Sequence, residues 1–230
     1  MIFKIFTVFP EFFESPLKTG LMGKAITSGI VKAEFTDIRN FSDDKHRRCD
    51  DYPYGGGSGM IMKPEPVLKA LGHVKRNGVT ILTSPSGKTL NQKLVKRLAA
   101  EKEISIVCSN YEGIDERVSV CVDFEISVGD YVLSGGEYAA LIIMDAVARY
   151  APGFMSNAES LQDESFEQDL LEYPQYTRPE ITEGMIVPPT LLSGNHEEIK
   201  RWRINESIKK TRLARPDLYK KYILKKLTGE

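Results

Sequence analysis

Residues 124–149 constrain the fold more than any other stretch, because they join a strand pattern to a long apolar helix through a glycine-bearing loop. Apolar and polar residues alternate over 124–128, which is the period of a half-buried strand. The segment 138–147 is apolar on nearly every side, so we expect this helix to be buried. Gly135 and Gly136 could present bare backbone amides to a ligand. The stretch alone favours the plainer alternative, a tight strand-to-helix turn without a ligand, because glycine-rich turns are common.

Strand and helix patterns alternate along the first two-thirds of the chain. Four helical patterns occur: one begins at Pro10, one covers 64–75, one ends at Lys102 and one covers 138–147. The strand patterns cover 2–9, 34–38, 79–83, 104–108 and 124–128. This alternation predicts an α/β domain with a largely parallel sheet. The first strand is apolar on both faces, which places it inside that sheet.

The loops after three consecutive strands predict where a ligand would bind. Turn-forming residues fill 84–87, 109–113 and 129–136, and each segment directly follows a predicted strand. Ligands of open α/β sheets bind outside the carboxyl ends of the strands. We therefore expect a pocket where these three loops meet.

The last third of the chain has a different character. Residues 156–172 hold six acidic and no basic side chains, which is typical of a flexible linker. From Glu197 to Glu230 there are eleven Lys and Arg against five Asp and Glu, so this part carries +6 while the whole chain carries −1. A basic helical segment suggests a polyanionic partner, and a solvated helix face explains the composition equally well. Trp202, between basic residues, could stack on a base or anchor a small core.

Composition and targeting signals indicate a globular cytoplasmic protein. The 230 residues are 41% hydrophobic and 27% charged, as in soluble domains. We find no apolar run long enough to span a bilayer and no signal peptide. The chain has three cysteines, Cys49, Cys108 and Cys121, and their spacing is not that of metal ligands. Because an odd number cannot all pair within one chain, we expect free thiols in a reducing compartment.

Two common ligand motifs are excluded. Gly87-Lys88-Thr89 ends like a phosphate-binding loop, but Leu82 stands where that motif needs its first glycine. Neither glycine cluster has the spacing of a dinucleotide-binding fingerprint. The three histidines have no mutual spacing typical of a metal site, so we expect no metal ligands among them.

Five segments of the chain, in order, carry a resemblance to a known family. They are YGGGSGM at 54–60, YEGIDER at 111–117, SVGDYVLSGGE at 127–137, YPQYTRP at 173–179 and GNH at 194–196. Together they resemble the bacterial tRNA (guanine-N1)-methyltransferases, the TrmD family, over nearly the whole chain. The resemblance implies a SPOUT-class α/β fold, a trefoil-knotted parallel sheet followed by a small C-terminal helical domain. Its expected boundaries are 1–155 for the cofactor-binding domain, 156–173 for the acidic linker and 174–230 for the basic domain.

The resemblance also implies a reaction. The expected enzyme transfers a methyl group from S-adenosylmethionine to N1 of guanosine 37 in tRNA, where another guanosine precedes the target. It is an obligate homodimer whose active site combines both subunits. A relative that methylates another RNA, or an RNA-binding module without catalysis, are the alternatives.

The three predicted loops coincide with the cofactor loops of the family. Glu112 is expected at ribose hydroxyls or at the cationic end of the cofactor, although it could simply cap the following segment. Ser109 stands where the family commonly has glycine, and we expect this difference to be tolerated. The full set implied to bind the cofactor is Pro85, Gly87, Ser109, Tyr111, Glu112, Gly113, Val128, Gly129, Asp130, Tyr131, Val132, Leu133, Gly135 and Gly136.

The implied chemistry needs a base and a cation. A carboxylate would take the N1 proton of guanine, and a cation would stabilise the charge that develops towards O6. The family's arginine corresponds to Arg149, and the family's aspartate before Ser-Phe corresponds to Glu164. Asp163 could serve after a shift of one residue, and both carboxylates could also be plain linker charges.

The basic domain is implied to hold the tRNA, and its expected contacts are His196, Lys200, Arg201 and Arg203, with Lys209, Lys210 and Arg212 near the backbone. Such binding should weaken with salt, and the target guanine must leave its stack to react. The family is described as needing magnesium for turnover. We find no ligand constellation for that ion in the sequence.

Overall fold

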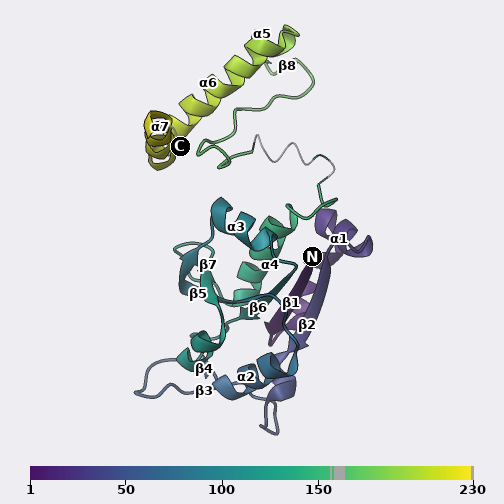
Figure 1. Cartoon of the computed structure of the whole chain (residues 1–230), viewed down its shortest axis with the longest axis vertical. Coiled ribbons are helices and arrows are strands. Elements are labelled where there is room, and N and C mark those ends of the chain that lie inside the picture. Colours follow the sequence, from purple (N-terminus) through teal and green to yellow (C-terminus); the bar gives the residue numbers. More distant parts are fainter. Residues whose placement is uncertain (156, 158–163, 229–230) are drawn as a thin grey trace. The chain divides into compact units, whose positions relative to one another are not determined.

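The computed structural model describes residues 1–155, 157 and 164–228 (Figure 1). The chain divides into two compact units, residues 1–156 and residues 157–230. Within the described residues no helix is both long enough and apolar enough to cross a membrane.

Unit 1 is built on one parallel sheet. Its strand order is β2-β1-β6-β5-β7, with bounds β2 (Lys32–Asp37), β1 (Ile2–Thr7), β6 (Glu103–Cys108), β5 (Val79–Thr89) and β7 (Phe124–Ser127). All four pairings are parallel. β1 has a neighbour on each side, and β6 is buried along its whole length. The predicted α/β class with a parallel sheet is therefore confirmed.

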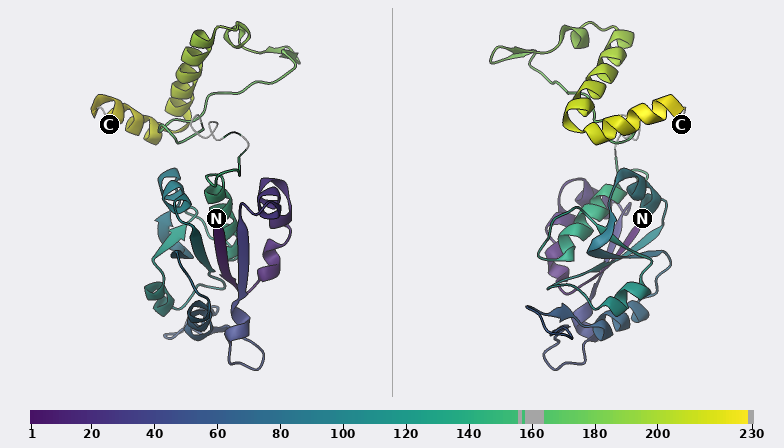
Figure 2. Two further views of the ribbon diagram at one scale, coloured as in Figure 1. Left: turned by 45° about the vertical axis from the view of Figure 1, so that its right-hand side comes forward. Right: turned by 90° about the vertical axis from the view of Figure 1, so that its left-hand side faces the viewer.

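Helices cover both faces of this sheet (Figure 2). Side chains alternate between faces along a strand, so Ile5, Ile81 and Ile106 pack with α1 (Gly20–Thr27), α3 (Gln92–Ala99) and α4 (Gly136–Ala148). The next residues along the same strands pack with α2 (Pro64–His73) in a second cluster. α4 contributes eight buried residues. The burial expected over 138–147 is therefore found on the face towards the sheet, whereas Tyr138 and Ile142 are exposed.

Two elements of unit 1 differ from expectation. The helix expected at Pro10 is replaced by two short 3-10 helices, Pro10–Phe13 and Pro16–Lys18, and the first α-helix begins at Gly20. β5 was expected to end at residue 83 but extends to Thr89. Its register on β7 shifts between Thr83 and Lys88, so residues 84–87 leave the ladder and return to it.

Residues 52–60 form a long loop before α2, and a two-stranded pair holds both ends of this loop. β3 (Asp50–Asp51) runs antiparallel to β4 (Ile61–Met62), and β4 forms isolated bridges to Tyr111 and Ile114. The remaining short helices of unit 1 are Ile38–Phe41 and Glu116–Cys121.

Unit 2 consists mainly of two helices, α6 (His196–Ala214) and α7 (Pro216–Thr228). The side chain of Asn195 caps α6 by accepting a hydrogen bond from Glu198 N–H at 3.3 Å. Pro216 begins α7, as proline does at a first helical position. Before α6 lie the hairpin β8 (Ile181–Thr182) with β9 (Met185–Ile186) and the short helix α5 (Pro189–Leu192).

Candidate active site

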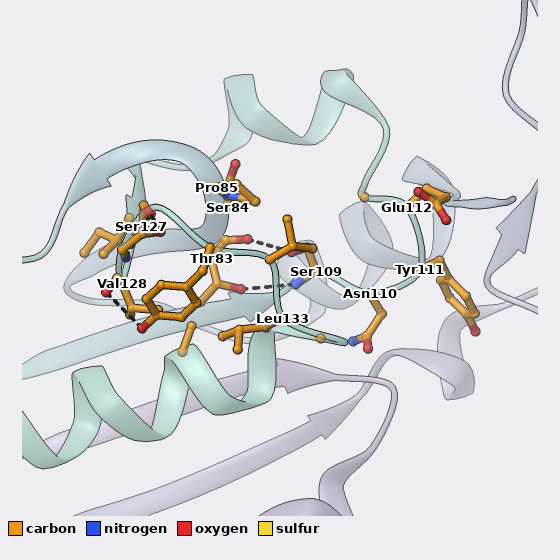
Figure 3. Close-up of a pocket in the computed structure, with 18 residues that line it drawn as sticks. Thr83, Ser84, Pro85, Ser109, Asn110, Tyr111, Glu112, Ser127, Val128 and Leu133 are labelled. Atoms are coloured by element: carbon orange, nitrogen blue, oxygen red, sulfur yellow. Dashed lines mark hydrogen bonds between the residues drawn. The ribbon is translucent and has the colours of Figure 1, made fainter. Parts of the chain in front are cut away.

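The three predicted loops line one cleft at the carboxyl edge of the sheet (Figure 3). The cleft holds about 650 Å³ of empty space, part of which is open solvent at its mouth. Val128 and Ser127 lie at one end of the view, Tyr111 and Glu112 lie at the other, and Thr83, Ser109 and Leu133 lie between them. The parallel strands β5, β6 and β7 bring these loops together because their ends share one edge.

Most of the residues expected at the cofactor line this cleft. They are Pro85, Ser109, Tyr111, Glu112, Gly113, Val128, Gly129, Tyr131, Val132, Leu133, Gly135 and Gly136. The lining also includes Ser84 and Asn110, which lie within the predicted loops but were not named as cofactor contacts, and Thr83, Ile126, Ser127 and Ala139, which lie outside those loops. Ile126 and Ser127 are the last two residues of β7, so a rule that included the strand ends as well as the loops would have found them.

Gly87 and Asp130 were expected at the cofactor but are not among the lining residues. A Cβ atom on Gly87 would lie 2.5 Å from the carbonyl carbon of Glu125 and from Ile126 N. Glycine at this position therefore serves the close approach of β5 to β7, where the strand returns to its ladder. In a sequence, such a packing glycine looks the same as a ligand-binding one.

Ser109 shows how this chain accommodates a side chain where glycine is common. Its hydroxyl donates a hydrogen bond to the carbonyl of Thr83 at 2.7 Å, and its N–H donates to Thr83 Oγ1 at 3.3 Å. The side chain is thereby tied to the end of β5. This geometry supports the expectation that the serine is tolerated.

The start of α4 is packed tightly against the ends of β5 and β6. Gly136 N–H donates to Ser109 O at 2.7 Å. A Cβ atom on Gly136 would lie 2.1 Å from Thr83 Oγ1 and 2.8 Å from Ser109 N. Only glycine lets the helix begin at this distance from the cleft wall.

A buried carboxylate supports the cleft from behind. Glu137 is 3% exposed, and its Oε1 accepts hydrogen bonds from Thr7 Oγ1 at 2.6 Å and from Asn110 Nδ2 at 2.8 Å. Buried charges need such partners. The contacts fix the side chain of Asn110, which lines the cleft, to α4 and to the end of β1. From the sequence, Glu137 is only the last residue of the segment 127–137 and has no predicted role of its own.

The loop 52–60 contacts the end of the cleft that contains Glu112. Glu112 N–H donates to Met60 O at 3.0 Å, and a Cβ atom on Gly59 would lie 2.4 Å from Glu112 Cγ. Tyr111 has a left-handed backbone with φ of 61°, a conformation costly for an aromatic residue. Burial, with Asp50 nearby, raises the pKa of its hydroxyl.

Arg149 lies at the opposite end of α4 from the cleft. Gly136 is the first residue of α4 and lines the cleft, whereas Arg149 follows the last residue, Ala148. At 1.5 Å per residue the two ends are about 20 Å apart. Arg149 is half-buried, and a side chain cannot cover that distance back to the cleft of its own subunit.

Glu164 belongs to unit 2, where it lines a second cleft. Three of the expected tRNA contacts, His196, Lys200 and Arg203, line the same cleft. The expected contact Arg201 is exposed and is not part of this lining. The alternative base, Asp163, lies outside the described residues.

Two aromatic contacts join α6 to the segment before it. The guanidinium of Arg203 lies 4.8 Å from the centroid of the Tyr173 ring, a cation–π geometry. Trp202 contacts Tyr176, with ring centroids 6.3 Å apart. Both alternatives for Trp202 remain compatible with this contact, because the indole is only half-buried.

The comparisons with known proteins decide the family. The family model described as tRNA (Guanine-1)-methyltransferase TrmD matches residues 1–221. This chain belongs to that family. The TrmD assignment confirms the resemblance, and the parallel five-stranded sheet with helices on both faces agrees with the SPOUT α/β fold.

Curated TrmD relatives are similar along almost their entire length. A tRNA (guanine-N(1)-)-methyltransferase of Dictyoglomus turgidum is 51% identical over 218 residues, covering 94% of this chain and 89% of the relative. One from Caldanaerobacter subterraneus subsp. tengcongensis is 49% identical, covering 96% and 92%. One from Clostridium botulinum is 50% identical, covering 98% and 93%.

Proposed function

We propose that this TrmD chain methylates N1 of guanosine 37 in tRNA, next to the anticodon, with S-adenosylmethionine as methyl donor. The observation that carries the proposal is the convergence of the irregular part of β5 at 84–87 and of the loops after β6 and β7 on one cleft. Family membership supports guanine N1 in tRNA as the target, because the relatives carry that activity in their names. We expect the reaction in the cytoplasm, where such a tRNA is found.

The cleft suits S-adenosylmethionine at both ends. Ile126, Val128 and Leu133 offer apolar surface for an adenine ring, and the backbone around Gly135 offers hydrogen-bonding groups for its edge. The carboxylate of Glu112 at the other end suits ribose hydroxyls or a cationic group. When bound, the cofactor supplies an electrophilic methyl group.

The chain itself supplies the proton chemistry in this proposal. Glu164 accepts the N1 proton of guanine, so that the N1 lone pair becomes nucleophilic. The guanidinium of Arg149 stabilises the negative charge that develops towards O6. Asp163 remains the alternative base. The described residues bring together no three His, Cys, Asp or Glu side chains able to hold a metal ion.

The separation of these groups supports a shared site in a homodimer. Arg149 is about 20 Å along α4 from the cleft of its own chain, so it can serve only a site in a second copy or a guanine held away from that cleft. α4 also exposes Tyr138 and Ile142, which are 49% and 44% accessible and lie on one side of the helix. A partner subunit that covers this face would exclude it from water, as in an isologous contact.

The proposed tRNA surface of unit 2 is smaller than its composition suggests. Lys200, Arg201 and Arg203 lie in the first turns of α6. Arg215 pairs with Asp217 at 2.6 Å, and Lys209 pairs with Glu206 at 3.6 Å. These pairs leave the amino-terminal half of α6, next to Glu164, as the strongest candidate for phosphate contacts.

The target atom is tested by analysis of the product nucleosides. After incubation of bulk unmodified tRNA with labelled S-adenosylmethionine, we expect the label in 1-methylguanosine only. Label in another methylated nucleoside would contradict the proposed atom while leaving a methyltransferase. Cofactor binding without any transfer would favour the RNA-binding alternative.

A further inference from the structure

The residues directly after Glu164 form a closed turn on the surface of α6 and α7. Phe166 N–H donates to Leu170 O at 2.8 Å, and Glu172 N–H donates to Ser165 Oγ at 3.0 Å. Phe166 and Asp169 both have left-handed backbones, with φ of 78° and 56°. Such conformations persist where the surroundings hold them in place. The acidic composition of 156–172 predicts a linker, but the part from 164 onwards is ordered within unit 2.

α6 holds this turn through one buried hydroxyl. Leu171 N–H donates to Thr211 Oγ1 at 2.8 Å, and Thr211 Oγ1 donates to Ser207 O at 2.6 Å. Thr211 is fully buried. Lys210 Nζ adds a hydrogen bond to Glu172 O at 3.0 Å. The carboxyl end of the turn is thereby fixed to the carboxyl-terminal part of α6.

α7 holds the same turn through charge. Asp169 is 5% exposed, and its carboxylate pairs with Lys221 and, at 2.5 Å, with Lys225. The two lysines are four residues apart, so they lie on one face of α7. A carboxylate this deeply buried is costly unless it is paired. Burial acts to raise the pKa of Asp169, and the hydrogen bonds from the two lysines outweigh it, so that the pKa lies below its usual range.

We propose that Asp169 is a positioning residue for the methyl transfer, because its ion pairs with Lys221 and Lys225 fix the turn that carries Glu164. This inference rests on the proposed function, in which Glu164 is the base. It assigns Lys221 and Lys225, whose side chains are 60% and 48% exposed, a structural role, so that α7 takes part in catalysis by holding the turn of the base. Glu164 then lies in a turn that unit 2 holds in place, five residues before Asp169.

The test begins with Asp169→Asn, which keeps the size of the side chain and removes its charge. We expect kcat to fall by about tenfold to a hundredfold, because small misplacements of a reacting group have effects of this size. The dissociation constant for S-adenosylmethionine and the KM for tRNA should stay within about threefold of wild type, since Asp169 lines neither cleft. The double variant K221Q/K225Q should reproduce the loss, and adding D169N to it should cost little more.

A matched control uses two other lysines of α7. Lys220 and Lys226 are exposed and make none of the described ion pairs, so K220Q/K226Q removes the same charge from the same helix. Its kcat should equal that of wild type. A fall in kcat equal to that of K221Q/K225Q would show that the net charge of α7 is responsible and would overturn the proposal.

Two further measurements separate positioning from mere folding. In an E164Q background, D169N should not lower the residual kcat further, because it acts through Glu164. An equal loss in both backgrounds, or a wild-type kcat in D169N, would overturn the inference. Hydrogen exchange at the Leu171 amide should accelerate in D169N, and unchanged exchange there would also overturn it. If wild type methylates no tRNA, the proposed function fails, and the exchange experiment still reports on the turn alone.

Discussion

Replacing Glu164 by glutamine should lower kcat by about a hundredfold to ten-thousandfold, the range expected for loss of a general base. Affinity for S-adenosylmethionine should not change, because Glu164 lines the cleft of unit 2 and not the cleft of unit 1. D163N, measured beside it, should retain most of the activity. Glu180→Gln, which removes an exposed carboxylate from the same unit, is the control. Normal turnover in the double variant D163N/E164Q would refute the assignment of the base to either residue.

Mixing two inactive variants tests whether the base and the cation come from different subunits. Co-expressed E164Q and R149A chains should form mixed dimers with one intact site each, provided that Arg149 of one chain serves with Glu164 of the other. About half of the dimers would be mixed, so roughly a quarter of the wild-type activity should return. Activity no higher than that of the separate variants would contradict a site shared in this way.

Replacing Gly136 by alanine should impair both the cleft and the stability of unit 1. The added Cβ would lie 2.1 Å from Thr83 Oγ1 and 2.8 Å from Ser109 N, so the start of α4 must move away from β5 and β6. Overpacking of this kind costs about 1–3 kcal/mol, and a displaced cleft wall should weaken S-adenosylmethionine binding by at least about tenfold. Urea unfolding and calorimetric titration measure the two effects.

Gly72→Ala is the control for this substitution. Gly72 lies in α2, and a Cβ atom there would meet nothing within 4 Å. Alanine in a helix is more favourable than glycine by about 0.5–1 kcal/mol, so this variant should be as stable as wild type or more stable. Wild-type stability and cofactor affinity in G136A would contradict the close packing described for the start of α4.

The cleft could be predicted from the sequence because parallel strands impose a simple geometry. Once strands were assigned to 79–83, 104–108 and 124–128, the loops after them had to meet at one edge of the sheet. The pattern could not separate Gly87, which serves strand packing, from Gly135 and Gly136, which line the cleft. Local sequence also carries no sign of the bonds that join Glu137 to Thr7 and Asn110, which are distant in the chain.

The order of residues 164–172 escaped prediction for a similar reason. Their acidic composition indicates flexibility when they are considered alone. The partners that order them, Thr211, Lys221 and Lys225, lie about 40 to 55 residues later. The same lysines were counted towards a nucleic-acid surface, because composition does not distinguish a paired charge from an unpaired one. The trefoil knot is an expectation drawn from the family, since strand and helix patterns carry no information on threading.

The most direct test of the central claim is methyl transfer to two tRNA transcripts that differ only at position 37. Labelled methyl from S-adenosylmethionine should enter the transcript with guanosine at 37 and should not enter the transcript with adenosine there. Equal labelling of both transcripts would contradict guanosine 37 as the target. No labelling of either, with the cofactor bound, would contradict the proposed methyl transfer to tRNA.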